Sequence, residues 1–147
     1  MLAHSIQGNL YLATQKPEKA LMSFRHTHQI QQSLRSFSGL VRACLDLKNK
    51  YAEALNFAKE ARRAMPNNAD AITLVAHVFA ADPSARKKAK ETFEEALKIN
   101  QSCFEAILGY SKLLEDDDQV QQAVELYGIW LFKKTIVVVV FAVFFKT

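Results

Sequence analysis

The sequence has few of the residues that interrupt regular secondary structure, with four glycines and three prolines among 147 residues. Both residue types disfavour helix interiors, so their scarcity leaves room for several helices separated by short turns. Cysteine is scarce too. Cys44 and Cys103 form no CxxC pair and have no histidine at a zinc-ligand spacing, which argues against a metal site or a disulfide framework. We interpret both as small apolar residues of a protein in a reducing compartment.

Motifs of enzyme chemistry are also missing. The four histidines are scattered, and His26 and His28 stand two residues apart, so they would point to different sides of a helix. The sequence contains no nucleophile elbow, no phosphate-binding loop and no zinc spacing. We therefore expect no catalytic site, no cofactor and no metal site. With 50% hydrophobic residues, a chain of this length can form one folded core.

A net charge of +4 raises the question of nucleic-acid binding, which the distribution of charge answers. The one dense basic run is ARKKAKE, Ala85 to Glu91. On a helix, lysine and glutamate four residues apart would pair at Lys87 and Glu91, Lys90 and Glu94, and Glu94 and Lys98. This pattern is typical of a solvated helix face, so we expect no nucleic-acid partner. The acidic run from Glu115 to Asp118 is interpreted as a solvated turn, since it lacks the glycine and distal glutamate of a calcium loop.

Small residues, in contrast, are frequent and recur at a fixed interval. Ala54, Ala58 and Ala61 are spaced by four and three residues, which places their methyl groups along one face of a helix. Ala20 lies 34 residues before Ala54, Ala89 lies 35 residues after it, and Ala123 follows Ala89 by another 34. In three of these four segments a second small residue stands at a similar distance before the alanine. Such a face allows another helix to approach closely. We predict that helices pack through Gly8, Ala20, Ala54, Ala61, Ala76, Ala89, Ala96, Ser111 and Ala123.

An interval of 34 residues with these small positions resembles the tetratricopeptide repeat, in which each unit is a helix-turn-helix. The second unit, which ends at Pro66, fits best, although Arg42 stands at its first small position. The resemblance implies an all-α, right-handed superhelical solenoid of about four helix-turn-helix units, followed by an atypical apolar C-terminal tail. The expected divisions are repeats at 1–34, 35–68, 69–103 and 104–130, the last incomplete, with the tail at 131–147.

Tetratricopeptide arrays bind partners through a concave surface made by the first helix of each unit. Positions carried over from the family place on that surface Asn9, Leu12, Asp46, Asp70, Thr73, His77, Leu108, Lys112 and Glu115, with Gly39, Ala43, Ala80 and Glu105 in equivalent positions. Members that bind chaperones hold a terminal carboxylate with a lysine at the fifth position of a unit and an asparagine at the ninth. Here Asn9 fits but Ser5 replaces the lysine, which argues against a cochaperone. The alternative function of a peptide-binding adaptor of another kind stays open.

The second and third units resemble, more specifically, subunit seven of the anaphase-promoting complex, the cell-cycle ubiquitin ligase. The resemblance rests on GLVRACLDLKNKYAEALNFAKEA, Gly39 to Ala61, and on ITLVAHVFAADPSARKKAKETFEEAL, Ile72 to Leu97, with a one-residue insertion and Asp82 and Pro83 in its turn. It implies a noncatalytic scaffold of the nucleus and cytosol that stacks on other tetratricopeptide subunits and forms a homodimer at full length. Because that protein is several times longer, the chain would supply a middle-to-late section, and the family's dimerisation through upstream repeats stays open here.

The last twenty residues, GIWLFKKTIVVVVFAVFFKT, break the repeat at Trp130 and lose its polar face. Ile136 to Phe145 is a run of ten apolar residues, about 15 Å as a helix against a bilayer core of roughly 30 Å, and Lys133 and Lys134 interrupt a longer run. Four consecutive valines favour extended structure. Three interpretations stay open: a sequence foreign to the repeat design, such as translated noncoding sequence; a segment that packs over the last repeat; and a membrane contact, as in a tail-anchored receptor, which the short run argues against.

Overall fold

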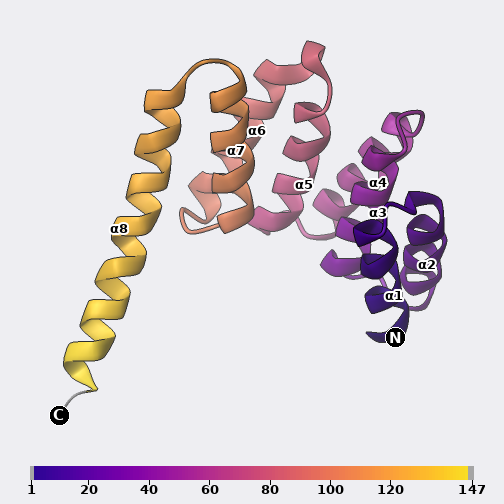
Figure 1. Cartoon of the computed structure of the whole chain (residues 1–147), viewed down its shortest axis with the longest axis horizontal. Coiled ribbons are helices and arrows are strands. Elements are labelled where there is room, and N and C mark those ends of the chain that lie inside the picture. The colour runs from indigo at the N-terminus through magenta and orange to yellow at the C-terminus, as the bar shows by residue number, and fades with distance from the viewer. Residues whose placement is uncertain (1, 146–147) are drawn as a thin grey trace.

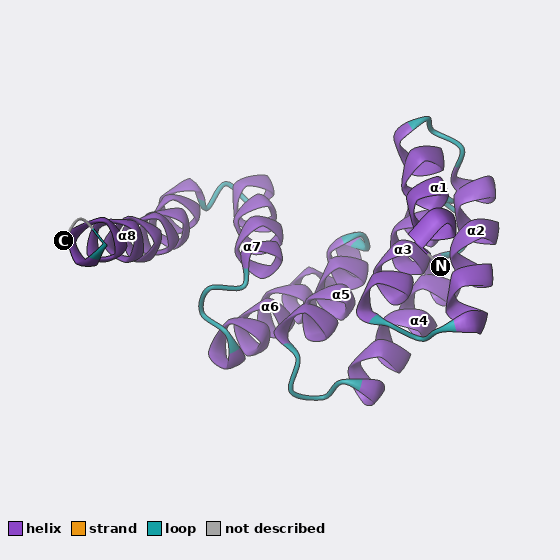
Figure 2. Cartoon of the chain, turned by 90° about the horizontal axis from the view of Figure 1, so that it is seen from below, coloured by secondary structure: helices purple, strands orange, loops and turns teal. Residues whose placement is uncertain are grey.

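The computed structural model describes residues 2–145, which form eight α-helices and one short 3-10 helix, η1 (Figure 1). The elements are α1 (Leu2–Ala13), α2 (Pro17–Ile30), α3 (Leu34–Asp46), α4 (Tyr51–Ala64), α5 (Ala69–Ala80), η1 (Pro83–Ala85), α6 (Arg86–Ile99), α7 (Phe104–Asp116) and α8 (Val120–Phe144). Short turns connect consecutive helices, which pack against each other (Figure 2). The scarcity of glycine and proline in the sequence is consistent with this helical content.

Two layers of helices build the array. The inner layer consists of α1, α3, α5 and α7, each of which packs against the next in this order. The outer helices α2, α4 and α6 each pack between two inner helices. An inner helix and the outer helix that follows it correspond to one helix-turn-helix unit, so the solenoid predicted from the 34-residue interval is confirmed.

Close packing between the two layers depends on small side chains. The nine small residues singled out by the sequence pattern are all buried, and the alanines among them are at most 1% exposed. The buried ring of Phe24 on α2 fills the space that two glycines leave: a Cβ atom on Gly8 would lie 2.7 Å from this ring, and one on Gly39 only 2.3 Å. Phe93 on α6 lies beside Gly109 in the same way. An aromatic ring of an outer helix thus meets a glycine of an inner helix in both halves of the array.

Polar side chains fix where several helices begin. Ser33 forms a reciprocal capping box with the residue three positions later at the start of α3. Asn68 caps α5, because its side-chain oxygen accepts hydrogen bonds from two backbone N–H groups of the first turn at 2.9 and 3.3 Å. Asp82 accepts hydrogen bonds from the backbone N–H and the hydroxyl of Ser84, and Pro83 begins η1. The one-residue insertion of the third unit is therefore accommodated as a 3-10 turn before α6.

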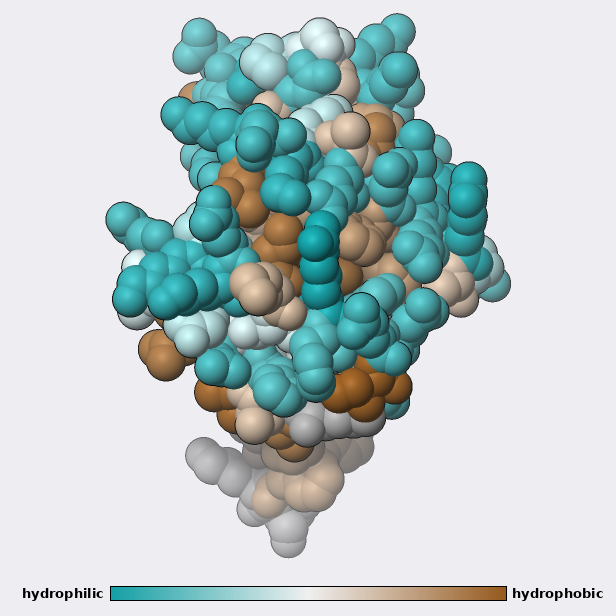
Figure 3. All heavy atoms as spheres, turned by 90° about the vertical axis from the view of Figure 1, so that its right-hand side faces the viewer, coloured by the Kyte–Doolittle hydropathy of each residue, from teal (hydrophilic) through white to brown (hydrophobic). Residues whose placement is uncertain are grey.

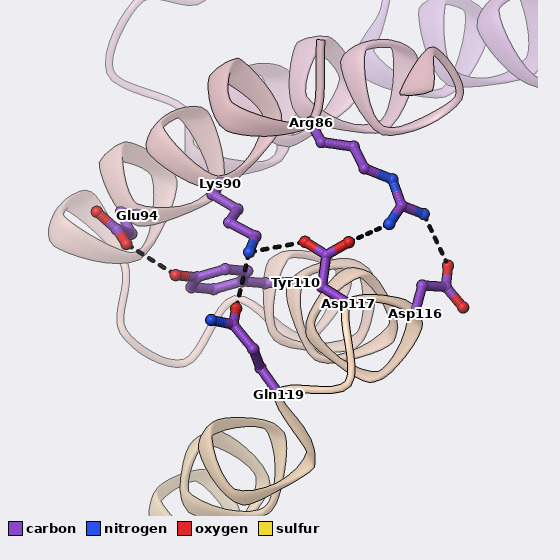
Figure 4. Close-up of polar contacts among 7 residues, drawn as sticks. All are labelled: Arg86, Lys90, Glu94, Tyr110, Asp116, Asp117 and Gln119. Atoms are coloured by element: carbon purple, nitrogen blue, oxygen red, sulfur yellow. Dashed lines mark hydrogen bonds and ion pairs between the residues drawn. The ribbon is translucent and has the colours of Figure 1, made fainter. Parts of the chain in front are cut away.

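The basic run at the start of α6 pairs with the acidic turn after α7 (Figure 4). Lys90 donates to Asp117 and to Gln119, at 2.7 Å in each case. Arg86 pairs with Asp117 and, at 3.7 Å, with Asp116. The hydrogen bond from Lys90, with the charges of Lys90 and Arg86, holds the pKa of the Asp117 carboxyl below its usual range. The interpretation of this acidic run as a solvated turn holds for Glu115 and Asp118, which are exposed, but it missed the ion pairs by which Asp116 and Asp117 connect to α6.

The lysine–glutamate pairs that the sequence predicted along α6 do not form. None of the three predicted pairs is among the ion pairs of residues 2–145. Lys90 reaches across to the turn after α7, while Glu94 accepts a hydrogen bond of 2.7 Å from the hydroxyl of Tyr110 on α7 (Figure 4). Burial and the neighbouring Glu94 raise the pKa of Tyr110, so its hydroxyl stays a donor. The reason for the error is tertiary: the neighbouring helix supplies better partners than the same helix does.

The last helix, α8, differs from the others in length and exposure. It runs for 25 residues, continues without a break through Lys133 and Lys134, and projects past the array (Figure 1). Ala123 is the only residue of α8 that is buried, and among the helices of residues 2–145 α8 packs on α7 alone. The expectation of extended structure at the valines is therefore wrong, as is packing of the tail over the last repeat. A helix satisfies every backbone group within the segment, whereas a strand would need a partner.

By length and composition, α8 is also the one helix of residues 2–145 that could cross a membrane, a property that buried core helices share. Its apolar window, however, is not buried within the protein at all. The surface at the opposite end, which carries α1 and α2, is mainly hydrophilic, and hydrophobic atoms gather toward its lower edge (Figure 3). Large exposed apolar residues occur on α1 and α2 too, among them Leu10 and Met22, but α8 carries a continuous run of them from Ile136 to Phe141.

Candidate partner-binding groove

The inner layer encloses a groove of about 750 Å³. It is lined by Asn9 from α1; Leu34, Arg35, Ser38, Gly39, Val41, Arg42 and Leu45 from α3; Asp70, Thr73, Leu74 and His77 from α5; and Glu105 from α7. All four inner helices thus contribute to one concave site. Its mixture of aliphatic and polar side chains is typical of a surface that binds a peptide segment.

The groove carries charge of both signs, on different helices. Arg35 and Arg42 stand seven residues apart on α3 and so lie on the same face of the helix. Neither arginine takes part in an ion pair within residues 2–145. Asp70 and Glu105 stand in the first turns of α5 and α7, where the helix dipole favours a carboxylate. A ligand would therefore meet two guanidinium groups on α3 and two carboxylates on the neighbouring inner helices.

His77 provides a neutral hydrogen-bonding group between these charges. Its ring packs edge-to-face against Phe93, with the two ring centroids 5.4 Å apart, and a Cβ atom on Gly109 would lie 2.6 Å from it. Burial lowers the pKa of His77 below the ordinary value of 6.5, against the opposing effect of Glu105. The imidazole is therefore neutral at pH 7. Among the described residues, no cluster of histidine, cysteine, aspartate or glutamate could hold a metal ion.

A buried thiol positions one of the two carboxylates. The Sγ atom of Cys103 donates a hydrogen bond of 3.1 Å to Oδ1 of Asp70, and the hydroxyl of Thr73 lies 3.8 Å from the same sulfur. Burial raises the pKa of Cys103, so the thiol keeps the proton that it donates. Cys44 is also buried, and burial raises its pKa to about 11. The interpretation of both cysteines as merely small apolar residues missed the hydrogen bond of Cys103.

The concave positions carried over from the family fall into two groups. Asn9, Asp70, Thr73 and His77 line the groove, together with Gly39 and Glu105 from the equivalent positions. Thr73 is nearly buried, and its hydroxyl donates to the backbone of Ala69 at 2.7 Å, so little of it is available to a ligand. The other five do not line the groove and are exposed or half-buried: Leu12, Asp46, Leu108, Lys112 and Glu115.

Sequence reasoning missed the basic side of the groove. Arg35, Ser38 and Arg42 line it, whereas Ala43, which the family positions placed on the concave surface, is fully buried. The face of α3 that borders the groove is therefore rotated by about one residue from the family positions. The sequence held one signal of this rotation, because Arg42 occupies a position where the repeat usually has a small buried residue.

The chain was compared with known proteins. No family model matches it. Anaphase-promoting complex subunit 7 of Arabidopsis thaliana is 39% identical over 108 residues, which are 74% of this chain and 19% of that protein. The subunit of the same name from Dictyostelium discoideum is 29% identical over 124 residues, 84% of this chain and 21% of that protein. The chain thus resembles these subunits over most of its own length but spans about a fifth of theirs.

Two solved structures support the assignment of the fold. A thermophilic tetratricopeptide-repeat protein of Thermus thermophilus superposes with a TM-score of 0.72 over 85% of this chain and 70% of its own, at 15% identity. MamA superposes with a TM-score of 0.61 over 87% of this chain and 74% of its own, at 19% identity. At such low identity the similarity concerns the fold alone, and it confirms a tetratricopeptide solenoid.

Proposed function

We propose that this chain, a tetratricopeptide-repeat solenoid similar to part of subunit 7 of the anaphase-promoting complex, is a noncatalytic protein-interaction scaffold of that ubiquitin ligase. The groove of the inner layer is the observation that carries the proposal, because it is concave and lined by both aliphatic and charged side chains from all four inner helices. Its function is to hold partners together, and ubiquitin transfer belongs to other subunits.

The proposed partners are other tetratricopeptide subunits of the complex and, in a full-length form, a second copy of the same protein. The proposed location is the nucleus and the cytosol, where the complex would support degradation of cell-cycle regulators. The groove favours an extended segment that presents a carboxylate to Arg35 and Arg42 and a basic side chain to Asp70 and Glu105. Such a partner would pair with the charges of both sides at once, and none of these charges takes part in an ion pair within residues 2–145.

Co-sedimentation tests the proposal. A tagged chain is expressed in proliferating cells, the lysate is separated on a density gradient, and the fractions are analysed by mass spectrometry. We expect the chain to travel with the large particle that contains the other subunits of the ubiquitin ligase. The experiment is repeated with the chain joined to the remaining repeats of a full-length subunit 7. If both forms migrate as small species, the proposal is contradicted, and a peptide-binding adaptor of another kind becomes the better interpretation.

A further inference from the structure

We propose that residues 135–144 of α8, with Phe145 directly after them, insert into one leaflet of an anionic lipid bilayer, with Trp130, Lys133 and Lys134 at the level of the headgroups. The inference concerns the tail alone and does not rest on the proposed scaffold function. It begins from the exposure of large apolar side chains that no other part of residues 2–145 covers.

The apolar surface surrounds the helix. Val137, Val138, Val139 and Val140 are 66%, 65%, 53% and 47% exposed, and on a helix four consecutive residues point in four directions about 100° apart. A partner helix or a protein groove covers one stripe of a helix and leaves the opposite side in water. Lipid covers all sides. The distribution therefore favours a bilayer over a protein partner or a second copy of the chain.

The length of the apolar segment selects one leaflet. Ile136 to Phe145 contains ten residues and extends about 15 Å, which is half of a hydrocarbon core of about 30 Å. A complete span of the same helix would need roughly twenty residues and would have to begin near Leu126. That placement would carry both lysines well inside the hydrocarbon, where ammonium groups are strongly disfavoured. Insertion into a single leaflet keeps them at the surface.

The residues just before the apolar segment fit the interface between lipid and water. The Nζ atom of Lys134 lies 4.6 Å from the centroid of the Trp130 ring, and Trp130 also packs on Phe104, with centroids 5.3 Å apart. Lys133 donates to the side chain of Gln101, so it lies beside the array. Tryptophan favours the headgroup level, and lysine is attracted to anionic lipid. Since α8 projects past the array, its tip can enter a bilayer while the groove stays in water (Figure 1).

Vesicle flotation of the intact chain tests the insertion. We expect the chain to float with vesicles of phosphatidylcholine and phosphatidylserine and to bind less to phosphatidylcholine alone. Val138→Asp/Phe141→Asp should abolish flotation, whereas Leu10→Asp/Met22→Asp, which alters exposed apolar residues of the array, should not. Lys133→Gln/Lys134→Gln should weaken binding to the anionic vesicles by about 25-fold, at roughly fivefold per lysine.

Trp130 is the only tryptophan of the chain, so its fluorescence measures the depth of insertion. We expect quenching by lipids labelled at the headgroup and little quenching by lipids labelled at the end of the acyl chain. The proposal is overturned if the wild-type chain does not float, or if Val138→Asp/Phe141→Asp floats as well as the wild type. It is also overturned if the chain sediments as an oligomer that Val138→Asp/Phe141→Asp dissociates into monomers but that added vesicles leave intact. In that case α8 would bind a second copy of the chain.

Discussion

At the scale of single residues, the packing of the array depends on glycines, whose lack of a side chain leaves room for an aromatic ring. Phe24 fits between α1 and α3 because Gly8 and Gly39 present no Cβ atom to its ring. The sequence pattern predicted the small position at Gly8 from its place in the repeat. It could not predict that Gly39 contacts an aromatic ring, because the spacing within α3 says nothing about which side chain of α2 approaches it.

A pair of glycine substitutions tests this packing. In Gly39→Ala the new methyl group would lie 2.3 Å from the Phe24 ring, whose surroundings are buried, so we expect a loss of about 1 to 3 kcal/mol in the free energy of unfolding. Gly128→Ala is the matched control, because no atom lies within 4 Å of its Cβ position, and helix propensity should stabilise the chain by up to about 1 kcal/mol. Urea unfolding monitored by circular dichroism measures both, and equal effects would contradict the packing described.

At the scale of helices, contacts between neighbouring helices decide what local spacing cannot. Lysine and glutamate four residues apart on α6 predict pairs along the helix, yet Lys90 pairs with Asp117 beyond α7. Asp117 is available because the turn after α7 brings it to α6, a placement that depends on how two helices pack. Sequence periodicity predicted the helices themselves, and their ionic partners required the structure.

The ion pairs at this junction make stability depend on pH in a defined direction. The folded protein lowers the pKa of Asp117, so the stabilising effect of its carboxylate is complete above the ordinary carboxyl pKa of about 3.9 and is lost as the pH falls through the lowered pKa of the folded state. We expect Asp117→Asn to lower the melting temperature at pH 7 and to lower it less at pH 3.

Asp118→Asn is the control for that experiment. Asp118 is exposed and takes part in no ion pair within residues 2–145, and its φ of 57° is a conformation that asparagine also tolerates. The melting temperature of the Asp118→Asn variant should equal that of the wild type at every pH. If Asp117→Asn lowers the melting temperature equally at pH 3 and pH 7, the junction is not held by the ionised carboxylate.

The helix α8 shows a second limit of sequence reasoning. Val137 to Val140 favour extended structure by intrinsic preference, but they continue a helix whose first turns pack on α7 through Ala123. Continuing a helix adds one backbone hydrogen bond per residue, whereas a strand there would have no neighbour to pair with. A formed helix therefore outweighs the local preference of four valines.

At the scale of the whole molecule, the repeats build two surfaces of different character. The inner layer forms a charged groove lined by Asn9, Arg42 and Glu105 among others, and α8 presents apolar side chains on every side. The regular interval of small residues was sufficient to predict the solenoid, whereas the expected concave positions came from the family resemblance, and four of them line the groove. The basic side of the groove was missed, since a rotation of α3 by about one residue is set by packing against its neighbours.

The central claim is that this groove joins the chain to the ubiquitin-ligase particle, and quantitative co-sedimentation of charge-reversal variants tests it most directly. Arg35→Glu/Arg42→Glu reverses the basic side of the groove and breaks none of the ion pairs found in the described part of the chain. Lys59→Glu/Arg63→Glu makes the same change of net charge on the exposed face of α4, away from the groove. We predict that the groove variant is depleted from the particle by about tenfold or more, because like charges would then meet, while the control stays with it. Equal amounts of both variants in the particle would contradict the claim.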